Sequence, residues 1–166
     1  AIGRLNALKN IDRMLRACTH TRNVRRIAIV GGGEEKEKLE SIAHQRGLDV
    51  SFFDGVSDAE KWRLLAQSRL LVFPSSFEGF GMPPLEALAL NIPALCSDIP
   101  ILQEIYANHV HYFRLNDVDD MDRMMDRILE GKQKRAGATS AFLKRFTWDA
   151  SAKEIEKLLL AYGDTR

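Results

Sequence analysis

Short apolar runs alternate with helical segments along almost the whole chain. Strands are predicted where apolar and β-branched residues cluster, at 25–31, 48–54, 69–74, 92–97 and 110–114. Helices are predicted between and after these runs, at 34–47, 57–68, 83–90, 100–108, 117–131, 132–146 and 147–163. Strands joined through helices of about ten residues or more form parallel sheets by right-handed crossovers. Since the strands are apolar throughout, helices are expected on both faces of the sheet. The pattern therefore predicts a Rossmann-like, doubly wound α/β fold with a parallel sheet flanked by helices.

The length of 166 residues limits the domain organisation. A chain of this size can bury a core without disulfides or metals, so we predict one domain over residues 1–146. Residues 147–166 are predicted to add a C-terminal helix. The first residues, "AIGRL", are typical of the end of a strand. We therefore expect the chain to be a fragment of a longer protein that starts near a domain boundary.

Charge and cysteine content narrow the classes of partner. A formal net charge of +1 gives no basic excess that would indicate a nucleic-acid partner. Cys18 and Cys96 fit no metal or redox spacing and are interpreted as reduced core thiols of a cytoplasmic protein. No apolar run reaches the roughly 20 residues needed to span a bilayer, and no signal peptide is recognised. For the full-length protein we expect peripheral association with the inner face of the membrane.

Open α/β sheets bind ligands outside the carboxyl ends of their strands. This rule selects four loops, at 4–9, 31–33, 55–57 and 75–82. The loop "GGGEEK" does not complete a dinucleotide fingerprint, because Lys36 stands where the third glycine belongs and two glutamates follow the turn. A glycine turn is favoured over direct phosphate binding by this loop. An NAD-dependent oxidoreductase is correspondingly disfavoured.

The segment "PSSFEGFGMPPLEALAL", residues 74–90, carries more chemistry. Its prolines fix the entry to a helix, and we expect several free backbone N–H groups in the first helical turn to form an anion site. Glu78 precedes this turn and Glu86 is predicted to lie within it. Carboxylates only accept hydrogen bonds, which suits vicinal hydroxyls. Taken singly, Glu86 could be a dipole partner and Glu78 a solvated loop acid. Together they favour a ligand with sugar hydroxyls on both sides of a phosphate.

The segment "GRLNALKN" follows the first strand end. Arg4 and Lys9 flank a short loop there and could clamp a diphosphate. From this segment alone, two ordinary surface cations are an equally good interpretation.

The ordered set of these motifs resembles a known family. "GRLNALKN", "VGGGEE", the segment 55–98 and "RFTWDASAKEIEKLL" are similar to the C-terminal domain of retaining glycosyltransferases of family four. Those enzymes have two facing Rossmann-like domains, the GT-B fold. The resemblance covers essentially the whole chain and is most specific at 55–98, where Glu78 and Glu86 stand in Glu-x7-Glu spacing. Asn91 replaces a common glycine after the helix, and asparagine tolerates the left-handed conformation expected there.

The resemblance implies a role for each site residue. Arg4 and Lys9 would neutralise the donor diphosphate, and Glu78 would hold the hydroxyls of the donor sugar as part of the catalytic group. The resemblance assigns the other donor contacts to Val56 near the base, to the backbone of Phe80, Gly81 and Met82 at the sugar and phosphate, and to Glu86 at the ribose. The helix at 148–162 would pack across to an N-terminal domain.

The implied reaction is transfer of a hexosyl group from a nucleoside-diphosphate sugar to an acceptor hydroxyl, with retention of configuration. No metal or further cofactor is implied. Mannosyl transfer is slightly favoured, because it is frequent among similar family members. The acceptor, a glycan or a lipid-linked saccharide, would be bound by the N-terminal domain, so we expect this chain alone to bind donor weakly and to be inactive. The alternative is a non-catalytic nucleotide-binding or regulatory module.

Overall fold

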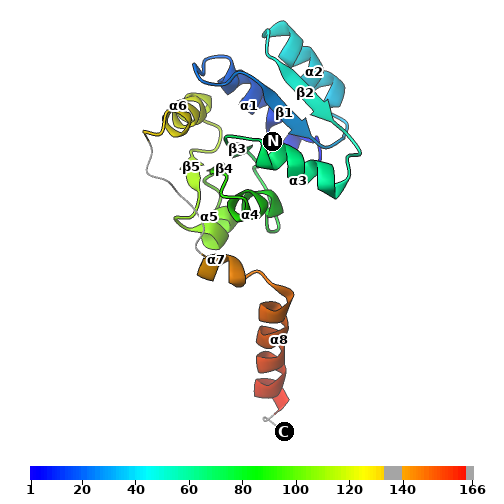
Figure 1. Ribbon diagram of the computed structural model, residues 1–166, viewed down its shortest axis with the longest axis vertical. Coiled ribbons are helices and arrows are strands. Elements are labelled where there is room, and N and C mark those ends of the chain that lie inside the picture. The colour runs from blue at the N-terminus through cyan, green and yellow to red at the C-terminus, as the bar shows by residue number, and fades with distance from the viewer. Residues whose placement is uncertain (133–139, 164–166) are drawn as a thin grey trace.

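The computed structural model describes residues 1–132 and 140–163, and its strands and helices alternate as predicted (Figure 1). The strands are β1 (Ile27–Val30), β2 (Val50–Phe53), β3 (Leu71–Phe73), β4 (Ala94–Ser97) and β5 (His111–Phe113). The helices of the sheet domain are the 3-10 turn η1 (Ala7–Lys9), α1 (Ile11–Cys18), α2 (Lys36–Gln45), α3 (Asp58–Ala66), α4 (Met82–Ala89), α5 (Pro100–Tyr106) and α6 (Val118–Leu129). Two helices follow, α7 (Ser140–Lys144) and α8 (Trp148–Gly163).

All strand pairs are parallel, as the crossover helices require. β1 pairs with β2, and β4 lies between β3 and β5, so the strands form two hydrogen-bonded sheets. Ile2 makes a parallel bridge to Val30 on the free edge of β1. This bridge places Gly3 beside the carboxyl end of β1. The loop that contains Arg4 therefore begins at that end of the strand. The hydrogen bond from Gly3 N to Val30 O, 2.9 Å long, fixes this register.

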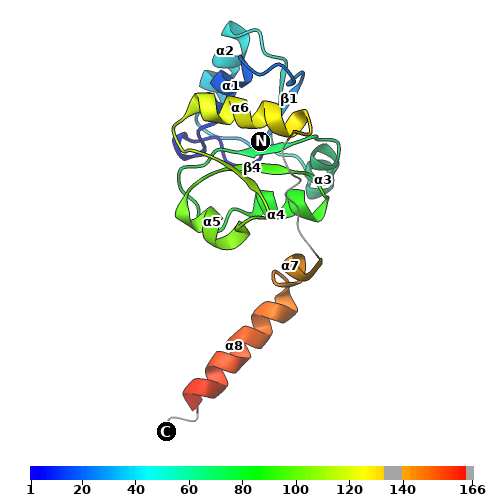
Figure 2. The same ribbon diagram turned by 90° about the vertical axis from the view of Figure 1, so that its left-hand side faces the viewer.

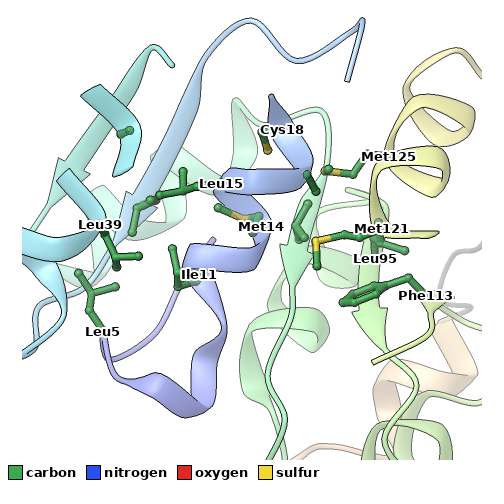
Figure 3. Close-up of a cluster of buried hydrophobic side chains, with 14 residues drawn as sticks. Leu5, Ile11, Met14, Leu15, Cys18, Leu39, Leu95, Phe113, Met121 and Met125 are labelled. Atoms are coloured by element: carbon green, nitrogen blue, oxygen red, sulfur yellow. The ribbon is translucent and has the colours of Figure 1, made fainter. Parts of the chain in front are cut away.

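Helices cover both faces of the strands, which confirms the doubly wound arrangement. α1 and α6 lie on one face, where Met14, Met121 and Met125 share one buried cluster with Leu95, and Leu15 lies on the side of α1 toward Leu39 (Figure 3). α4 and α5 cover the other face (Figure 2). Their buried side chains pack with strand residues in a second cluster that includes Leu88, Leu102, Tyr106, Phe73 and Cys96. Burial of both faces explains why the strands read as continuous apolar runs.

The C-terminal part differs from the sequence prediction. The helix predicted over 132–146 is observed only as α7, Lys132 is not helical, and residues 133–139 of the predicted span lie outside the described residues. α8 extends away from the sheet domain in both views (Figures 1 and 2). Its Trp148 side chain is 92% exposed. Among the described helices, none combines the length and the apolar character needed to cross a membrane.

Candidate donor site

The loop that follows Gly3 and the loop that follows β3 are held together by hydrogen bonds. The Asn10 amide donates to the carbonyl of Pro74 over 2.9 Å, in a buried position. Both the backbone N–H and the hydroxyl of Ser76 donate to the carbonyl of Leu8, over 2.8 and 3.1 Å. Asn10 adopts the left-handed conformation, with φ of 49°, which asparagine tolerates. Segments far apart in sequence thus form one surface at the carboxyl edge of the strands.

Lys9 and Glu78 form an ion pair on this surface. Lys9 Nζ donates to Glu78 Oε1, and the two side chains keep only 19% and 11% of their exposure. Lys9 Nζ also lies 5.5 Å from the centre of the Phe73 ring. The sequence predicts both residues as site residues, but it does not predict that they contact each other. The carboxylate and the ammonium therefore compensate each other's charge, and both site residues lie at the same position on this surface.

Arg4 stands five positions before Lys9, in the loop that follows Gly3, and is exposed. Its guanidinium makes no ion pair with any residue in 1–132 or 140–163. Charge at Arg4 is thus available to an anionic ligand.

The glycine loop after β1 packs against the Arg4 loop. A Cβ atom at Gly31 would lie 2.0 Å from the carbonyl oxygen of Gly3, and one at Gly33 would lie 2.3 Å from that of Leu5. The Leu5 N–H also donates to the Gly32 carbonyl over 2.8 Å. Close backbone packing accounts for these glycines. This geometry supports the glycine-turn interpretation and fixes the position of the Arg4 loop.

The amino end of α4 corrects two details of the sequence prediction. The helix begins at Met82, so Glu86 lies in its second turn and not in its first. Pro83 and Pro84 follow Met82 and have no N–H to donate. The free N–H groups at this helix end are therefore those of Gly81 and Met82, fewer than predicted. Gly81 has φ of 83°, a left-handed conformation that favours glycine.

The loop before α4 packs against the second buried cluster, which contains Tyr106. The Tyr106 hydroxyl donates to the Gly81 carbonyl over 2.5 Å. Burial raises the pKa of Tyr106, so the hydroxyl remains a donor. Phe80 packs edge-on against Phe146 with 5.6 Å between ring centres, and its side chain is only partly exposed. Phe77 is the exposed aromatic side chain of this loop, at 69%. These contacts hold the backbone of residues 80–82 in place; Gly81 is buried, and Met82 is the exposed residue of the three, at 52%.

Glu86 contacts α3 through Lys61, a residue that the sequence prediction missed. Lys61 Nζ lies 2.9 Å from Glu86 Oε1. The hydrogen bond to Glu86 raises the pKa of Lys61, against the lowering effect of burial, so the side chain remains a cation. Val56 lies in the loop before this helix, next to Ser57, whose hydroxyl caps α3 by accepting from the Glu60 N–H. No local spacing could reveal Lys61, since its partner is on another helix.

A cavity of about 480 Å³ lies elsewhere, between β1 and β3. Its lining includes Arg25, Ile27, Leu70 and Val72, and none of the predicted site residues. The cavity is therefore separate from the candidate donor site. Within the described ranges, no group of three or more His, Cys, Asp or Glu side chains is arranged to hold a metal ion.

Comparison with known proteins places the chain among sugar-transferring enzymes. The family described as "Glycosyl transferases group 1" matches residues 1–145. Two curated relatives come from Escherichia coli. The serotype-specific mannosyltransferase WbdA is 32% identical over 122 residues, which cover 72% of this chain and 15% of WbdA. The O-antigen biosynthesis glycosyltransferase WclY is 29% identical over 160 residues, which cover 93% of this chain and 44% of WclY. The chain thus spans less than half the length of these relatives.

A solved structure has the same fold as this chain. Anabaena HepE, crystallised in complex with UDP, superimposes with a TM-score of 0.84 at 19% identity. The superposition covers 96% of this chain and 47% of HepE. It confirms the predicted fold class, a Rossmann-like α/β half of a GT-B glycosyltransferase.

Proposed function

Because the chain belongs to the group 1 glycosyltransferases, we propose that it is the donor-binding domain of a retaining hexosyltransferase. It would bind a nucleoside-diphosphate sugar at the carboxyl edge of the strands. The observation that carries this proposal is the ion pair of Lys9 with Glu78, formed between two loops that hydrogen bonds hold together. The exposed Arg4 and the amino end of α4 belong to the same pair of loops.

Charge development defines what the site has to do. The diphosphate gains negative charge as the glycosidic bond breaks. Arg4, Lys9 and the N–H groups of Gly81 and Met82 would stabilise that charge. By analogy with oxyanion holes, one well-placed donor can contribute about 3 kcal/mol.

The Lys9–Glu78 pair links the sugar end of the donor to its phosphate end. Glu78 would accept hydrogen bonds from sugar hydroxyls. The Lys9 ammonium has three N–H donors, so it would donate to a diphosphate oxygen while it stays in contact with Glu78. Since the two side chains already contact each other, both would be fixed before the donor arrives. Glu86 would accept from the ribose hydroxyls, and Val56 would lie near the base. No residue of this site is assigned to bind a metal.

The rest of the reaction belongs to the longer protein. We propose that the acceptor, a glycan or lipid-linked saccharide, is bound by a second domain, and that α8 packs against that domain. Residues 1–146 would be the donor-binding domain and 147–166 the connecting helix. We place the full-length protein in the cytoplasm, with a peripheral position at the inner face of the membrane as part of the proposal.

The donor sugar is proposed to be mannose. The name of WbdA, a mannosyltransferase, supports this choice. HepE was crystallised with UDP, so the alternative is a donor with a uridine nucleotide. Comparing the affinities of the chain for GDP and UDP distinguishes the two.

Titration calorimetry of the 166-residue chain with GDP, UDP and NAD tests the proposal. We expect weak binding of GDP or UDP, with loss of affinity in Arg4→Ala and Glu86→Ala. Arg127→Ala, at an exposed position on α6, is the matched control and should bind as the wild type. Binding of NAD in preference to both nucleoside diphosphates, or full affinity in Arg4→Ala, would contradict it. Nucleoside diphosphate binding by a full-length protein that transfers no sugar would instead indicate a regulatory module.

A further inference from the structure

Lys61 and Glu86 connect two helices at the edge of the proposed donor site. The residues stand 25 positions apart, on α3 and α4, and their side chains retain 21% and 13% of their exposure. Lys61 Nζ also lies 3.3 Å from Asp58 Oδ1, but that carboxylate is 89% exposed. An exposed pair contributes little, so the contact with Glu86 is the stronger of the two. The Trp62 ring, with its centre 5.5 Å from Lys61 Nζ, further restricts the ammonium.

The contact leaves Glu86 able to bind a ligand. A carboxylate offers about four lone-pair sites, and Lys61 engages one of them, on Oε1. Two vicinal hydroxyls can therefore donate to the same carboxylate while the lysine remains in place. The lysine restricts the rotation of the Glu86 side chain, which reduces the conformational entropy lost on binding.

The lysine also changes the charge that a diphosphate meets. An unpaired Glu86 carboxylate near the helix end would repel an anionic ligand. Lys61 compensates that charge from the side of α3. The carboxylate can then act as an acceptor of hydrogen bonds without acting as a barrier to phosphate.

We propose that Lys61 is a positioning residue of the ribose subsite, which holds Glu86 in the orientation that accepts the two ribose hydroxyls. This role rests on the proposed function, since it assigns Glu86 to the ribose of a nucleoside diphosphate. Its specific consequence is discrimination between ribose and a sugar ring that lacks the hydroxyls.

The test compares GDP and UDP with their 2′,3′-dideoxy counterparts by titration calorimetry. For the nucleotide that binds, wild type should prefer the ribose form, and Glu86→Gln should reduce this preference by about tenfold. Lys61→Met should reduce the preference by roughly threefold, and Lys61→Arg should restore most of it. In the Glu86→Gln background, Lys61→Met should have no further effect on the preference.

Lys132→Met, which removes a lysine paired with Glu130 at the far end of α6, is the control and should leave the preference unchanged. Equal loss of affinity for the ribose and dideoxy forms in Lys61→Met would overturn the role of Lys61 alone. An unchanged preference in Lys61→Met would do the same. Failure of the wild type to bind either nucleoside diphosphate would overturn the proposed function and this role together.

Discussion

At the scale of single residues, Glu78 and Lys9 define the electrostatics of the site. Their contact joins loops that are 69 positions apart in sequence. Glu78→Gln removes the negative charge but keeps the shape, so Lys9 becomes an uncompensated cation. We predict that the affinity for GDP or UDP rises by about two- to fivefold, as expected for loss of one partner of a partly exposed pair. The affinity for the corresponding nucleotide sugar should fall, because the sugar hydroxyls lose their acceptor. Equal losses for both ligands would argue against this role for Glu78.

The two thiols provide a residue-scale test of the core. Cys18 and Cys96 are both buried, and burial raises the pKa of Cys18 to about 12 and that of Cys96 still further. The thiolate is the reactive form, and the raised pKa keeps Cys18 almost entirely in the unreactive thiol form at pH 8. We predict negligible labelling of the folded chain by Ellman's reagent at pH 8, a rate that increases with pH, and rapid labelling of both thiols in denaturant. Rapid labelling of the native chain at pH 8 would show that these side chains are accessible.

A site residue can be predicted from the sequence when it belongs to a continuous motif. It cannot be predicted in this way when its role depends on a contact between distant segments. Glu78 and Glu86 stand in one continuous motif, so their spacing alone is enough to predict that both belong to one site. Lys61 could not be found in this way, because its contact with Glu86 depends on how α3 and α4 pack. The overestimate of free N–H groups at α4 has a different cause. Pro83 and Pro84 already stand in the first turn of the predicted helix 83–90, and proline has no N–H to donate.

At the scale of elements, Gly81 fixes the junction between the loop and α4. A Cβ atom there would lie 2.8 Å from Leu102 Cδ2 and 3.2 Å from Phe73 Cε1, at a positive φ. We predict that Gly81→Ala lowers the free energy of unfolding by about 2 kcal/mol or more, measured by urea denaturation. Gly79→Ala, two residues earlier, is the matched control, because an added Cβ there meets nothing within 4 Å. Similar stability losses in the two variants would contradict the described junction.

The elements themselves could largely be predicted from the sequence. β1 to β5 lie within the predicted runs, because burial on both faces makes such strands apolar throughout. Asn91, with φ of 57°, adopts the left-handed conformation expected after α4. The span 132–146 was harder to predict, since a polar, alanine-containing segment has helical propensity whether or not it packs on the domain. Only α7 is observed as helix within the described part of that span.

At the scale of the whole molecule, α8 exposes apolar side chains that the sheet domain does not cover. Ile155, Leu159 and Leu160 are 58%, 68% and 67% exposed on a helix that extends away from the sheet domain. We predict that Leu159→Gln with Leu160→Gln changes the unfolding free energy of the 166-residue chain by less than about 0.5 kcal/mol. Leu88→Ala, in the buried cluster, should cost about 2 to 5 kcal/mol and serves as the contrast. If α8 packs against a second domain as proposed, the double substitution should reduce transferase activity in the full-length protein. A large stability loss in the isolated chain would show that α8 belongs to this domain instead.

The proposed donor site extends across the loops at 4–9 and 78–82. A titration of the 15N-labelled 166-residue chain with GDP-mannose and with UDP-glucose, followed by amide chemical shifts, tests it directly even if binding is weak. With one of these donors, we predict the largest shifts at the N–H groups of Gly81 and Met82, accompanied by shifts in the loop at 4–9. Shifts concentrated around Arg25 and Leu70 at the other cavity, or no shifts at Gly81 and Met82 with either donor, would contradict it.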